Sequence, residues 1–549
     1  MSLVDTVARQ FADLSAAERA LLDDLGRDDR PAGPIRPAGP QTEARGPVLA
    51  AALLALEQDG RRGRSVHLDG WRIDGSLALD DLELRRRVVF DGCEFAAPFS
   101  ADCAHLAGLE FRNCTLAAGL SAREARVEAD LALLACKVTG AVALESIRID
   151  GDFDCRRTVL RQGAAPTVET GDDEGNKRRE QYRRDELVNL VGAHVAGRVR
   201  FDNISCDGRL RLTNIRVGGD VDCWNAGFVA NGDEENGLIL TNAAVEEKII
   251  ITKLKVTPRT VLKFDYSRAR LFQGDADEES WPQTGRLGLE GFSFDFVAFM
   301  ARRQTPDRPD NKVISAEVAI AWLERLGPLF HRQPYMQIAR VFRDQGYLNE
   351  SIEVLIAQEE GDRRRRTERL LLRLRDGGEA RRTAAVLASA TLAVARCLNP
   401  WRYMRYGYRP LNAVYVLAAL FVIGAVLFGE GHSRSLIVPA RDSVYLSDRY
   451  DPAIGIKDPV VYPEFNPWLY SLDTLVPVFQ LGQEEHWQPN ARTDFSGAIM
   501  TPDAPDPWHE RPFRAGALLS GYLYFFHIPM GWLFSVLFFA GISRRLQVG

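Results

Sequence analysis

The stretch of sequence that decides the fold is VHLDGWRIDGSLALDDLELRRRVVFDGCEFAAPFSADCAHL, residues 66–106. It repeats an eleven-residue unit whose apolar side chains first stand at Val66, Leu68, Trp71 and Ile73. Within each pair the apolar residues alternate with one outward residue, which is the period of a β-strand. An amphipathic helix would instead need apolar residues three, four and seven apart. The unit therefore predicts very short strands that are separated by tight corners.

The same unit recurs over most of the first 300 residues. It begins again near residues 77, 88, 99, 109, 120, 131, 142 and 153, then near 188, 199, 210, 221, 238 and 249, and more loosely near 264 and 287. A polar insertion at 162–187 separates the two series. Two units make a 22-residue coil with four short sides, and stacked coils of this kind form a parallel β-helix.

We therefore expect a mainly β solenoid over residues 63–295, the parallel β-helix of eleven-residue half-coils. The N-terminal 62 residues have a different pattern, with helical periods at 5–26 and 47–58 around a Pro-rich link at 30–40. Solenoids need a cap on their terminal coil, because its edge is otherwise unpaired. The two helical segments are expected to provide that cap.

The repeat also accounts for most of the cysteines. Six of the 8 cysteines fall on apolar sites of the unit, namely Cys93, Cys114, Cys136, Cys155, Cys206 and Cys223. Small buried side chains suit these sites, so core packing is the favoured interpretation. No Cys-x-x-Cys pair occurs, which argues against a zinc site or a redox dithiol.

The period becomes helical from about Ser293, and residues 296–399 form an expected helical linker domain. Residues 332–362 predict two short amphipathic helices joined at Gly346, similar to a single tetratricopeptide-type hairpin. One such hairpin favours packing over a peptide-binding array. The run that follows, Arg363, Arg364, Arg365 and Arg366, predicts either a solvated helix face or a contact for anionic lipid or an acidic partner.

Two stretches in residues 400–549 are long and apolar enough to cross a bilayer. They are residues 411–428 and 515–542, and neither contains Asp, Glu, Lys or Arg. Arginines flank them, with Arg402, Arg405 and Arg409 before the first and Arg544 and Arg545 after the second. Residues 430–514 between them hold 13 acidic and 7 basic residues, a net charge of −6. The positive-inside rule then predicts a two-pass protein with both termini in the cytoplasm.

Residues 465–483 between the two stretches are apolar but too short and too Pro-broken to cross a membrane. YSLDTLVPV (470–478) is similar to the pore helix of pore-loop channels, which also place it between two spans. The candidate pore and selectivity residues are Thr474, Val478, Phe479, Gln480, Leu481, Gly482, Glu484 and Glu485.

Potassium filters need consecutive backbone carbonyls in a Gly-Tyr-Gly setting, and the segment after Val478 lacks the first glycine. Potassium selectivity is therefore not expected. Glu484 and Glu485 would form an acidic ring in an oligomer and favour cations. The alternative is an amphipathic loop that braces the outer leaflet.

Composition and motifs limit the classes of function that the chain can have. With 69 basic and 75 acidic residues the net charge is −6, which gives no reason to expect a nucleic-acid partner. The sequence contains no dinucleotide fingerprint, P-loop, Gly-x-Ser-x-Gly, His-Glu-x-x-His or haem-attachment motif. We therefore expect no cofactor, no metal site and no catalytic residue, although an enzyme is not excluded.

The chain resembles a family of large bacterial membrane proteins common in actinobacteria. The resemblance rests on QPYMQIARVFRDQG (333–346), the four-arginine run, YGYRP (406–410) and FNPWLYSLDTLVPVFQLGQEEHW (465–487). Such proteins are similar to pentapeptide-repeat proteins in their N-terminal part, and many carry the label "membrane-associated oxidoreductase". The resemblance implies a location in the bacterial inner membrane.

Three functional hypotheses follow. The first is an oligomeric channel-like pore with a cytoplasmic β-helix that senses a ligand or sets the assembly. The second is a membrane-tethered scaffold whose β-helix binds a protein or small-ligand partner. The third, implied by the resemblance alone, is a membrane-associated oxidoreductase. Membrane lipids and further copies of the chain are the expected partners.

Overall fold

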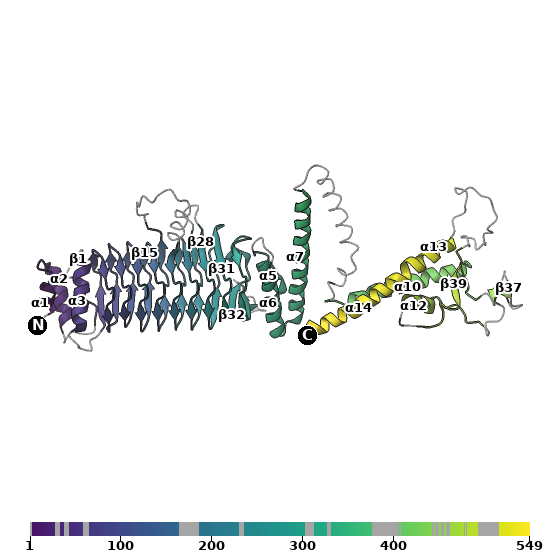
Figure 1. Cartoon of the computed structure of the whole chain (residues 1–549), viewed down its shortest axis with the longest axis horizontal. Coiled ribbons are helices and arrows are strands. Elements are labelled where there is room, and N and C mark those ends of the chain that lie inside the picture. Colours follow the sequence, from purple (N-terminus) through teal and green to yellow (C-terminus); the bar gives the residue numbers. More distant parts are fainter. Residues whose placement is uncertain are drawn as a thin grey trace. The chain divides into compact units, whose positions relative to one another are not determined.

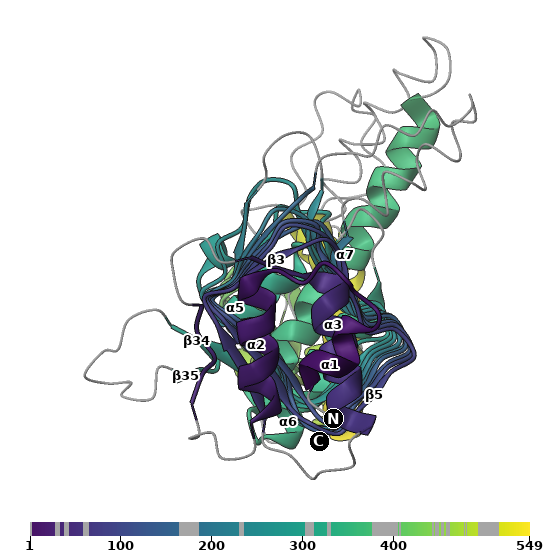
Figure 2. The same ribbon diagram turned by 90° about the vertical axis from the view of Figure 1, so that its left-hand side faces the viewer.

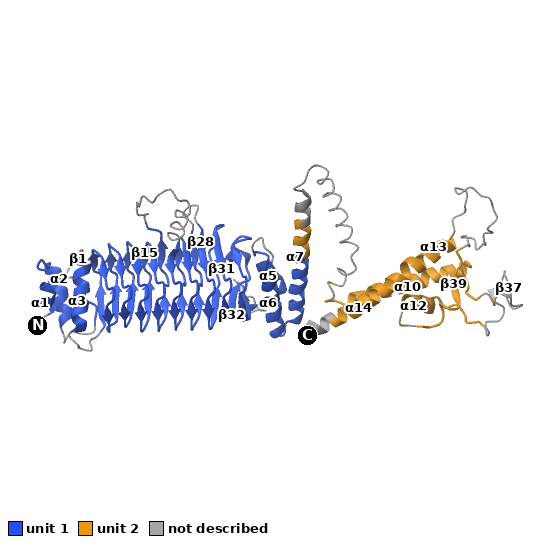
Figure 3. Cartoon of the chain, viewed as in Figure 1, with its two compact units in different colours: residues 1–362 blue, residues 363–549 orange. Residues whose placement is uncertain are grey.

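The chain forms two compact units, Met1–Asp362 and Arg363–Gly549 (Figure 3). The computed structural model describes residues 3–27, 33–37, 43–58, 65–163, 186–229, 235–301, 312–326, 331–375, 405, 408–441, 444, 450–451, 455–456, 462–476, 478, 480–491 and 515–548. The predicted insertion at 162–187 lies mostly outside the described residues.

The first unit is built around a stacked series of short parallel strands, and the predicted β-solenoid is confirmed (Figure 1). Val66 pairs with Val88, and Val88 pairs with Leu109 in turn. Residues about 22 apart are therefore neighbours in space, as the double eleven-residue unit predicts. The solenoid has about 9 turns.

Three sheets form the sides of the described coils. One sheet contains β1 (Glu43–Arg45), β3 (Arg72–Asp74), β7 (Glu94–Phe95), β11 (Thr115–Leu116), β15 (Lys137–Thr139), β19 (Val159–Arg161), β23 (Ser205–Cys206) and β27 (Gly227–Phe228). A second contains β4 (Leu77–Ala78), β8 (Phe99–Ser100), β12 (Leu120–Ser121), β16 (Val142–Ala143), β20 (Glu186–Asn189), β24 (Arg209–Arg211), β28 (Asn236–Ile239), β31 (Thr260–Lys263) and β33 (Leu287–Gly288).

The third and largest sheet takes two strands from most coils. Its members are β2 (Val66–Asp69), β5 (Glu83–Leu84), β6 (Val88–Asp91), β9 (His105–Leu106), β10 (Leu109–Arg112), β13 (Arg126–Val127), β14 (Leu131–Leu134), β17 (Arg148–Ile149), β18 (Phe153–Asp154), β21 (His194–Val195), β22 (Val199–Arg200), β25 (Arg216–Val217), β26 (Val221–Asp222), β29 (Ala244–Val245), β30 (Lys248–Ile251), β32 (Arg268–Asp275), β34 (Ser293–Met300) and β35 (Lys312–Val313).

The two-residue corners explain why the unit is so regular. The second residue of each corner adopts a positive φ, which Gly and Asn tolerate best. These two residue types occupy the corner at Gly70, Gly92, Asn113, Gly192, Asn203, Asn214, Asn225, Asn242 and Gly291. Asparagines on neighbouring coils also hydrogen-bond to one another, as Asn225 Nδ2 does to Asn203 Oδ1 at 2.7 Å.

Apolar side chains fill the interior of the coils. Phe90 and Phe111, from adjacent coils, stack with ring centroids 5.3 Å apart. The six cysteines expected in the core are all buried. Stacking the same apolar site on every turn therefore produces one continuous core along the solenoid.

The cysteines on the third apolar site also act as hydrogen-bond donors. Cys114 Sγ lies 3.3 Å from the carbonyl oxygen of Phe90, which belongs to strand β6 of the preceding coil. The same bond recurs from Cys93 to Leu68, Cys136 to Phe111, Thr158 to Leu133 and Ser267 to Leu240. The hydrogen bond with the Cys136 thiol, together with burial, raises the pKa of Cys114 to about 12. A buried thiol with a raised pKa stays protonated, so Cys114 donates to the backbone and does not act as a nucleophile.

Helices cover the N-terminal end of the solenoid, with α1 (Leu3–Ala8), α2 (Ala16–Gly26) and α3 (Gly46–Gln58) lying across the first coil (Figure 2). Strand β1 extends the sheet by pairing in parallel with β3. Glu18 of α2, which is 1% exposed, connects this helix to strand β1. Its carboxylate accepts hydrogen bonds from Arg45 Nε at 2.8 Å and from the backbone N–H of Ser15 at 2.8 Å.

Burial opposes ionisation of Glu18, but the bonds from Arg45 and Ser15 outweigh it and lower the pKa of Glu18 to about 2. The ionised carboxylate is therefore part of the folded cap. The edge strand β1 depends on it, because Arg45 belongs to that strand.

The other end of the solenoid differs from the sequence prediction. Ser293 was expected to begin a helical region, but β34 pairs in parallel with β32 and completes a further coil. Its sequence, SFDFVAFM, contains phenylalanine and valine, which favour strands, and the solenoid therefore extends past the predicted boundary at 295. Helix α5 (Ala316–Leu323) follows, and its Trp322 stacks on Phe272 with ring centroids 5.1 Å apart.

The predicted helical hairpin is present but unequal. Helix α6 (Arg332–Asp344) ends before Gly346, whose φ is +88°, and α7 begins at Leu348. Helix α7 (Leu348–Arg375) continues far past the expected end at 362 and contains the four-arginine run. Arg, Leu and Glu are strong helix formers, so nothing after residue 362 ends the helix.

The second unit contains two helices that are long and apolar enough to cross a membrane, a property of length and composition only. They are α10 (Leu411–Ser433) and the continuous stretch of α13 (Ala515–Tyr522), the π-turn η3 (Leu523–His527) and α14 (Ile528–Val548). Between them in the chain lie α12 (Pro467–Leu475) and two short antiparallel pairs, β36 (Ile437–Pro439) with β39 (Trp487–Pro489) and β37 (Tyr450–Asp451) with β38 (Gly455–Ile456).

Candidate functional site

The described part of residues 465–487, here called the hairpin, packs against both apolar helices of the second unit (Figure 1). Helix α12 begins at Pro467, with Asn466 as its N-cap: the Asn466 side-chain oxygen accepts from the backbone N–H of Trp468 at 3.0 Å. Proline at the first turn and a capping asparagine are both strong start signals. The helix ends at Leu475, close before Pro477.

Helix α12 runs antiparallel to α10 and reaches its middle. Phe465 stacks on His432 near the end of α10, with ring centroids 4.5 Å apart. One and a half turns further on, Ser471 Oγ donates to the carbonyl oxygen of Phe421 at 2.8 Å. Phe421 lies near the midpoint of Leu411–Ser433, so the hairpin enters along half the length of α10.

Close packing on small residues allows this approach. A Cβ atom added at Gly424 of α10 would clash with Ser471 Oγ and with the ring of His527. A Cβ added at Gly531 of α14 would clash with the carbonyl oxygen of Leu475, at the end of α12. Glycines that let helix backbones touch are typical of helix contacts in membranes.

The π-turn in the last apolar helix carries a buried histidine. Pro529 has no N–H to give to the preceding turn, so the helix widens at Leu523–His527. His527 is 0% exposed, with Nε2 at 3.3 Å from the Ser471 carbonyl and Nδ1 at 3.2 Å from the Tyr522 hydroxyl. The ring therefore ties α12 to this helix as a packed, hydrogen-bonded residue.

A buried carboxylate holds the return segment, which is the name used here for the described residues among 478–487 that follow α12. Asp473, which is 8% exposed, accepts the backbone N–H of Leu481 on Oδ1 at 2.7 Å and the backbone N–H of Glu484 on Oδ2 at 2.9 Å. Gln483 closes the hairpin, because its Oε1 accepts the backbone N–H of Asn466 at 3.2 Å. The amides of Leu481 and Glu484 thus point back to α12, and the Gln483 carbonyl accepts from the backbone N–H of Trp487 at 3.0 Å.

The structure separates the predicted pore residues into two groups. Thr474 is buried and its hydroxyl donates to the Tyr470 carbonyl within α12, at 2.8 Å. The remaining described residues lie in the return segment, where Val478, Gln480, Leu481, Glu484 and Glu485 are exposed and Gly482 has a φ of +77°. Phe479 lies outside the described residues.

Glu484 and Glu485 stand side by side at the end of the return segment. Partial burial, followed by the carboxylates of Asp473 and Glu485, raises the pKa of Glu484. His486, next in the chain, places Nδ1 2.6 Å from the Gly482 carbonyl. Among the described residues, no group of three His, Cys, Asp or Glu side chains is arranged to hold a metal ion.

The arginines expected to contact lipid or a partner lie on helices or beside them. Arg364 and Arg366 of α7 are exposed, whereas Arg363 and Arg365 are half-buried. Arg409 is exposed just before α10, and Arg405 is exposed with a φ of 45°. Arg402 lies outside the described residues.

Sequence reasoning did not identify Asp473, Ser471, Gln483, Gly424 or Gly531 as part of this arrangement. A charged residue inside an otherwise apolar helix was an available signal for Asp473, because such a side chain needs partners. Comparison of the chain with protein-family models, curated proteins and solved structures finds no match. The arrangement of the hairpin is therefore the main guide to function.

Proposed function

We propose that the chain is a bacterial inner-membrane protein that assembles into an oligomeric, channel-like pore. The observation that carries the proposal is the hairpin, which enters between two apolar helices to the midpoint of α10 and returns. At 1.5 Å per residue, the part of α10 from His432 to Phe421 is about 16 Å long. A bilayer core is about 30 Å thick, so the hairpin would end near its centre.

The return segment is built to present backbone to a shared axis. Irregular backbone is tolerated at membrane depth only where protein buries it or where it lines a water-filled cavity. Asp473 binds the amides of Leu481 and Glu484, and the planar trans peptide directs the Gln480 carbonyl away from Asp473, whereas the carbonyls of Gly482 and Gln483 are already taken up by His486 and Trp487. Rings of carbonyls and of carboxylates are the usual elements of a cation filter, and Glu484 and Glu485 follow directly.

One chain cannot enclose a water path with two helices, so the proposal requires an oligomer. Only 28% of the most apolar stretch of each long helix is buried within the chain, which leaves most of both surfaces to lipid or to neighbouring copies. The arginines before α10 and after residue 543, together with the acidic segment between, favour both termini in the cytoplasm. The solenoid would then lie in the cytoplasm as a sensor or assembly domain.

The first experiment is the mass of the particle in nanodiscs. A tetramer, pentamer or larger ring supports the pore and justifies recording in planar bilayers, whereas a monomer or dimer overturns it. In the recordings, the double variant Glu484→Ala with Glu485→Ala should lower cation preference. The matched control is Glu464→Ala, an exposed acid before α12, which should leave the reversal potential unchanged. An unchanged reversal potential in the double variant contradicts the acidic ring.

A membrane-tethered scaffold is the second candidate. The observation in its favour is a row of exposed arginines on adjacent coils of the solenoid, Arg126, Arg148 and Arg216, with His194 between the last two. It predicts a monomeric or dimeric anchor and a ligand at the solenoid. The oxidoreductase label of the family that the chain resembles is a third candidate. It requires a cofactor to copurify with the chain, which an absorbance spectrum of the purified protein would reveal.

A further inference from the structure

Five successive coils of the solenoid carry a histidine or arginine at one outward position of the largest sheet. The strand register stacks these residues directly on one another, in the order His105, Arg126, Arg148, His194 and Arg216. Neighbouring parallel strands lie about 4.8 Å apart. Five cationic or titratable groups therefore follow each other along one line on the surface.

Acidic side chains neutralise only the first part of this row. Glu128 pairs with His105 at 3.1 Å, and Asp150 pairs with Arg126 at 3.2 Å and with Arg148 at 3.3 Å. The next two coils have Ala196 and Gly218 at the position of these acids. Within the described residues, neither His194 nor Arg216 forms an ion pair.

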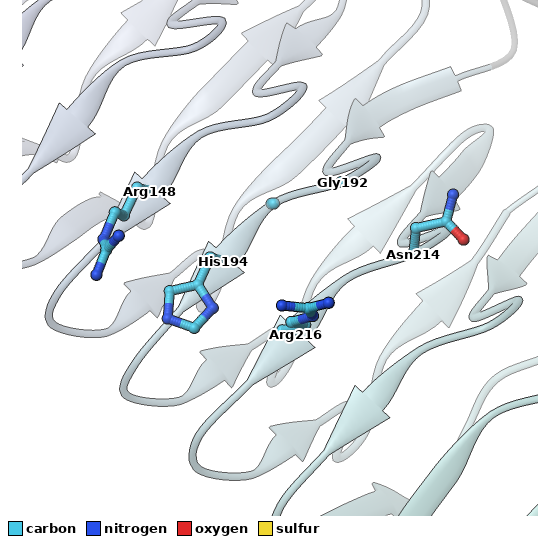
Figure 4. A pocket seen from close by; sticks show the side chains of 6 residues that line it. Arg148, Gly192, His194, Asn214 and Arg216 are labelled. Atoms are coloured by element: carbon cyan, nitrogen blue, oxygen red, sulfur yellow. The ribbon is translucent and has the colours of Figure 1, made fainter.

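A missing side chain makes a hollow at the same place. The neighbouring corner carries Ser146, Gly192 and Asn214 on three successive coils, and the glycine leaves a gap between the other two. The resulting hollow has a volume of about 380 Å³ and is lined by Arg148, Gly192, Ala193, His194, Asn214 and Arg216 (Figure 4). Figure 4 shows Arg148, His194 and Arg216 in a row on adjacent coils.

The polar groups at this hollow are donors. Asn214 Oδ1 already accepts a hydrogen bond from Asn242 Nδ2 at 2.7 Å, so Asn214 can bind a ligand through the N–H groups of its side-chain amide. The two arginines supply planar guanidinium groups, which bind oxyanions in a bidentate manner. No carboxylate lines the hollow itself, although Asp150 beside it is shared by Arg148 and Arg126. Arg216 has no acidic partner among the described residues, so the hollow keeps a net positive charge.

We propose that this hollow binds a phosphate-type oxyanion, with Arg148 and Arg216 on either side of it and His194 beneath. The volume lies in the range of small-ligand sites. The phosphate can belong to a free phosphorylated small molecule or to a lipid headgroup, and the experiment separates the two. Anion binding at this site does not require a pore, so the experiment tests it independently of the proposed function.

The test is calorimetric titration of the full chain, in nanodiscs of neutral phosphatidylcholine, with inorganic phosphate and with pyrophosphate at low ionic strength. We expect saturable binding of one anion per chain. Arg216→Gln should weaken it at least tenfold, since a hydrogen bond to a charged group contributes about 1.5–3 kcal/mol and 1.4 kcal/mol is tenfold. Arg85→Gln is the matched control, because Arg85 is exposed but lies away from the hollow.

Gly192→Asp provides a second variant that preserves the corner. Asp81 already occupies an equivalent corner with a φ of 57°, close to the 70° of Gly192, so the substitution fits the backbone. The added carboxylate should abolish binding. Thermal unfolding of both variants, compared with the wild type, shows whether the solenoid is intact.

Nanodiscs containing anionic phosphatidylglycerol identify the source of the phosphate. Weaker binding of free phosphate there than in neutral nanodiscs indicates that the headgroup competes for the hollow, whereas equal binding indicates a free ligand. The proposal is overturned if no saturable binding occurs with either anion. It is equally overturned if Arg216→Gln binds like the wild type, or if Arg85→Gln loses as much affinity as Arg216→Gln.

Discussion

Replacing Asp473 by alanine should release the return segment of the hairpin without unfolding the rest of the chain. The carboxylate is the acceptor for two backbone amides, those of Leu481 and Glu484, at 2.7 and 2.9 Å. Asp473→Ala removes both bonds and leaves two N–H groups without their partner. The two long helices keep their own hydrogen bonds, so the effect should be local.

The magnitude follows from the surroundings of these amides. An orphaned buried donor costs about 1–3 kcal/mol, which for two amides would amount to about 2–6 kcal/mol. Leu481 is 44% exposed, so water reaches this turn and relieves part of the cost. We therefore expect a loss of about 2–3 kcal/mol in the free energy of local opening. That corresponds to amide exchange faster by about 30- to 150-fold.

Hydrogen–deuterium exchange with mass spectrometry, on the full chain in nanodiscs, measures this directly. Peptides that cover residues 478–487 should exchange faster in Asp473→Ala, and peptides from the solenoid should not change. Asp473→Asn should give an intermediate rate, because one oxygen remains as an acceptor. Glu485→Ala is the control, since Glu485 lies twelve residues after Asp473 and its carboxylate accepts no hydrogen bond from the described residues.

Wild-type exchange across 478–487 in Asp473→Ala would refute the reasoning. It would mean that lipid or another copy of the chain, and not Asp473, holds the return segment. Faster exchange of equal size in Glu485→Ala would refute it as well, because the change would then reflect the loss of any negative charge.

Three further predictions concern single side chains. The folded pKa of Glu18 is about 2, below the ordinary 4.5, so its stabilisation of the cap is present above pH 4.5 and is lost as the pH falls towards 2. Glu18→Gln should lower the free energy of unfolding by about 2 kcal/mol at pH 7. In thermal unfolding, the variant should also show a weaker dependence of stability on pH. Cys114→Ala should destabilise the solenoid by about 1–2 kcal/mol in denaturant unfolding, and Cys114→Ser by less, because serine keeps the donor to the preceding coil. Gly531→Ala should accelerate amide exchange in α12, since the added methyl meets the Leu475 carbonyl, whereas Gly521→Ala, which has open space, should not.

The solenoid was predictable because its information is periodic. Apolar residues at Val66, Leu68, Trp71 and Ile73 specify sides and corners within eleven residues, and repetition multiplies the signal. The corner geometry was partly visible too, since Gly and Asn recur where φ is positive. The predicted end at 295 was wrong because apolar residues in SFDFVAFM satisfy a strand and a buried helix equally well.

The hairpin was predictable in its place but not in its contacts. The Pro-broken apolar segment and the flanking apolar stretches indicated a segment that enters and returns. Its depth depends on which residues of different helices touch, such as Ser471 with Phe421 and Gly531 with Leu475. These pairs lie 50 or more residues apart in sequence, where periodicity carries no information.

The stacking of coils also constrains how the chain can change in length during evolution. Each row of outward side chains stays aligned only if whole turns are gained or lost, because half a turn would carry every later row to the opposite side. Both stretches of additional sequence separate a strand of the same sheet (β19 or β27) from a strand of a second sheet (β20 or β28). The strand register is kept across them, since Arg148 pairs with His194 and Arg216 with Ala244. One corner thus absorbs insertions while the surface chemistry of the other sides is inherited in register.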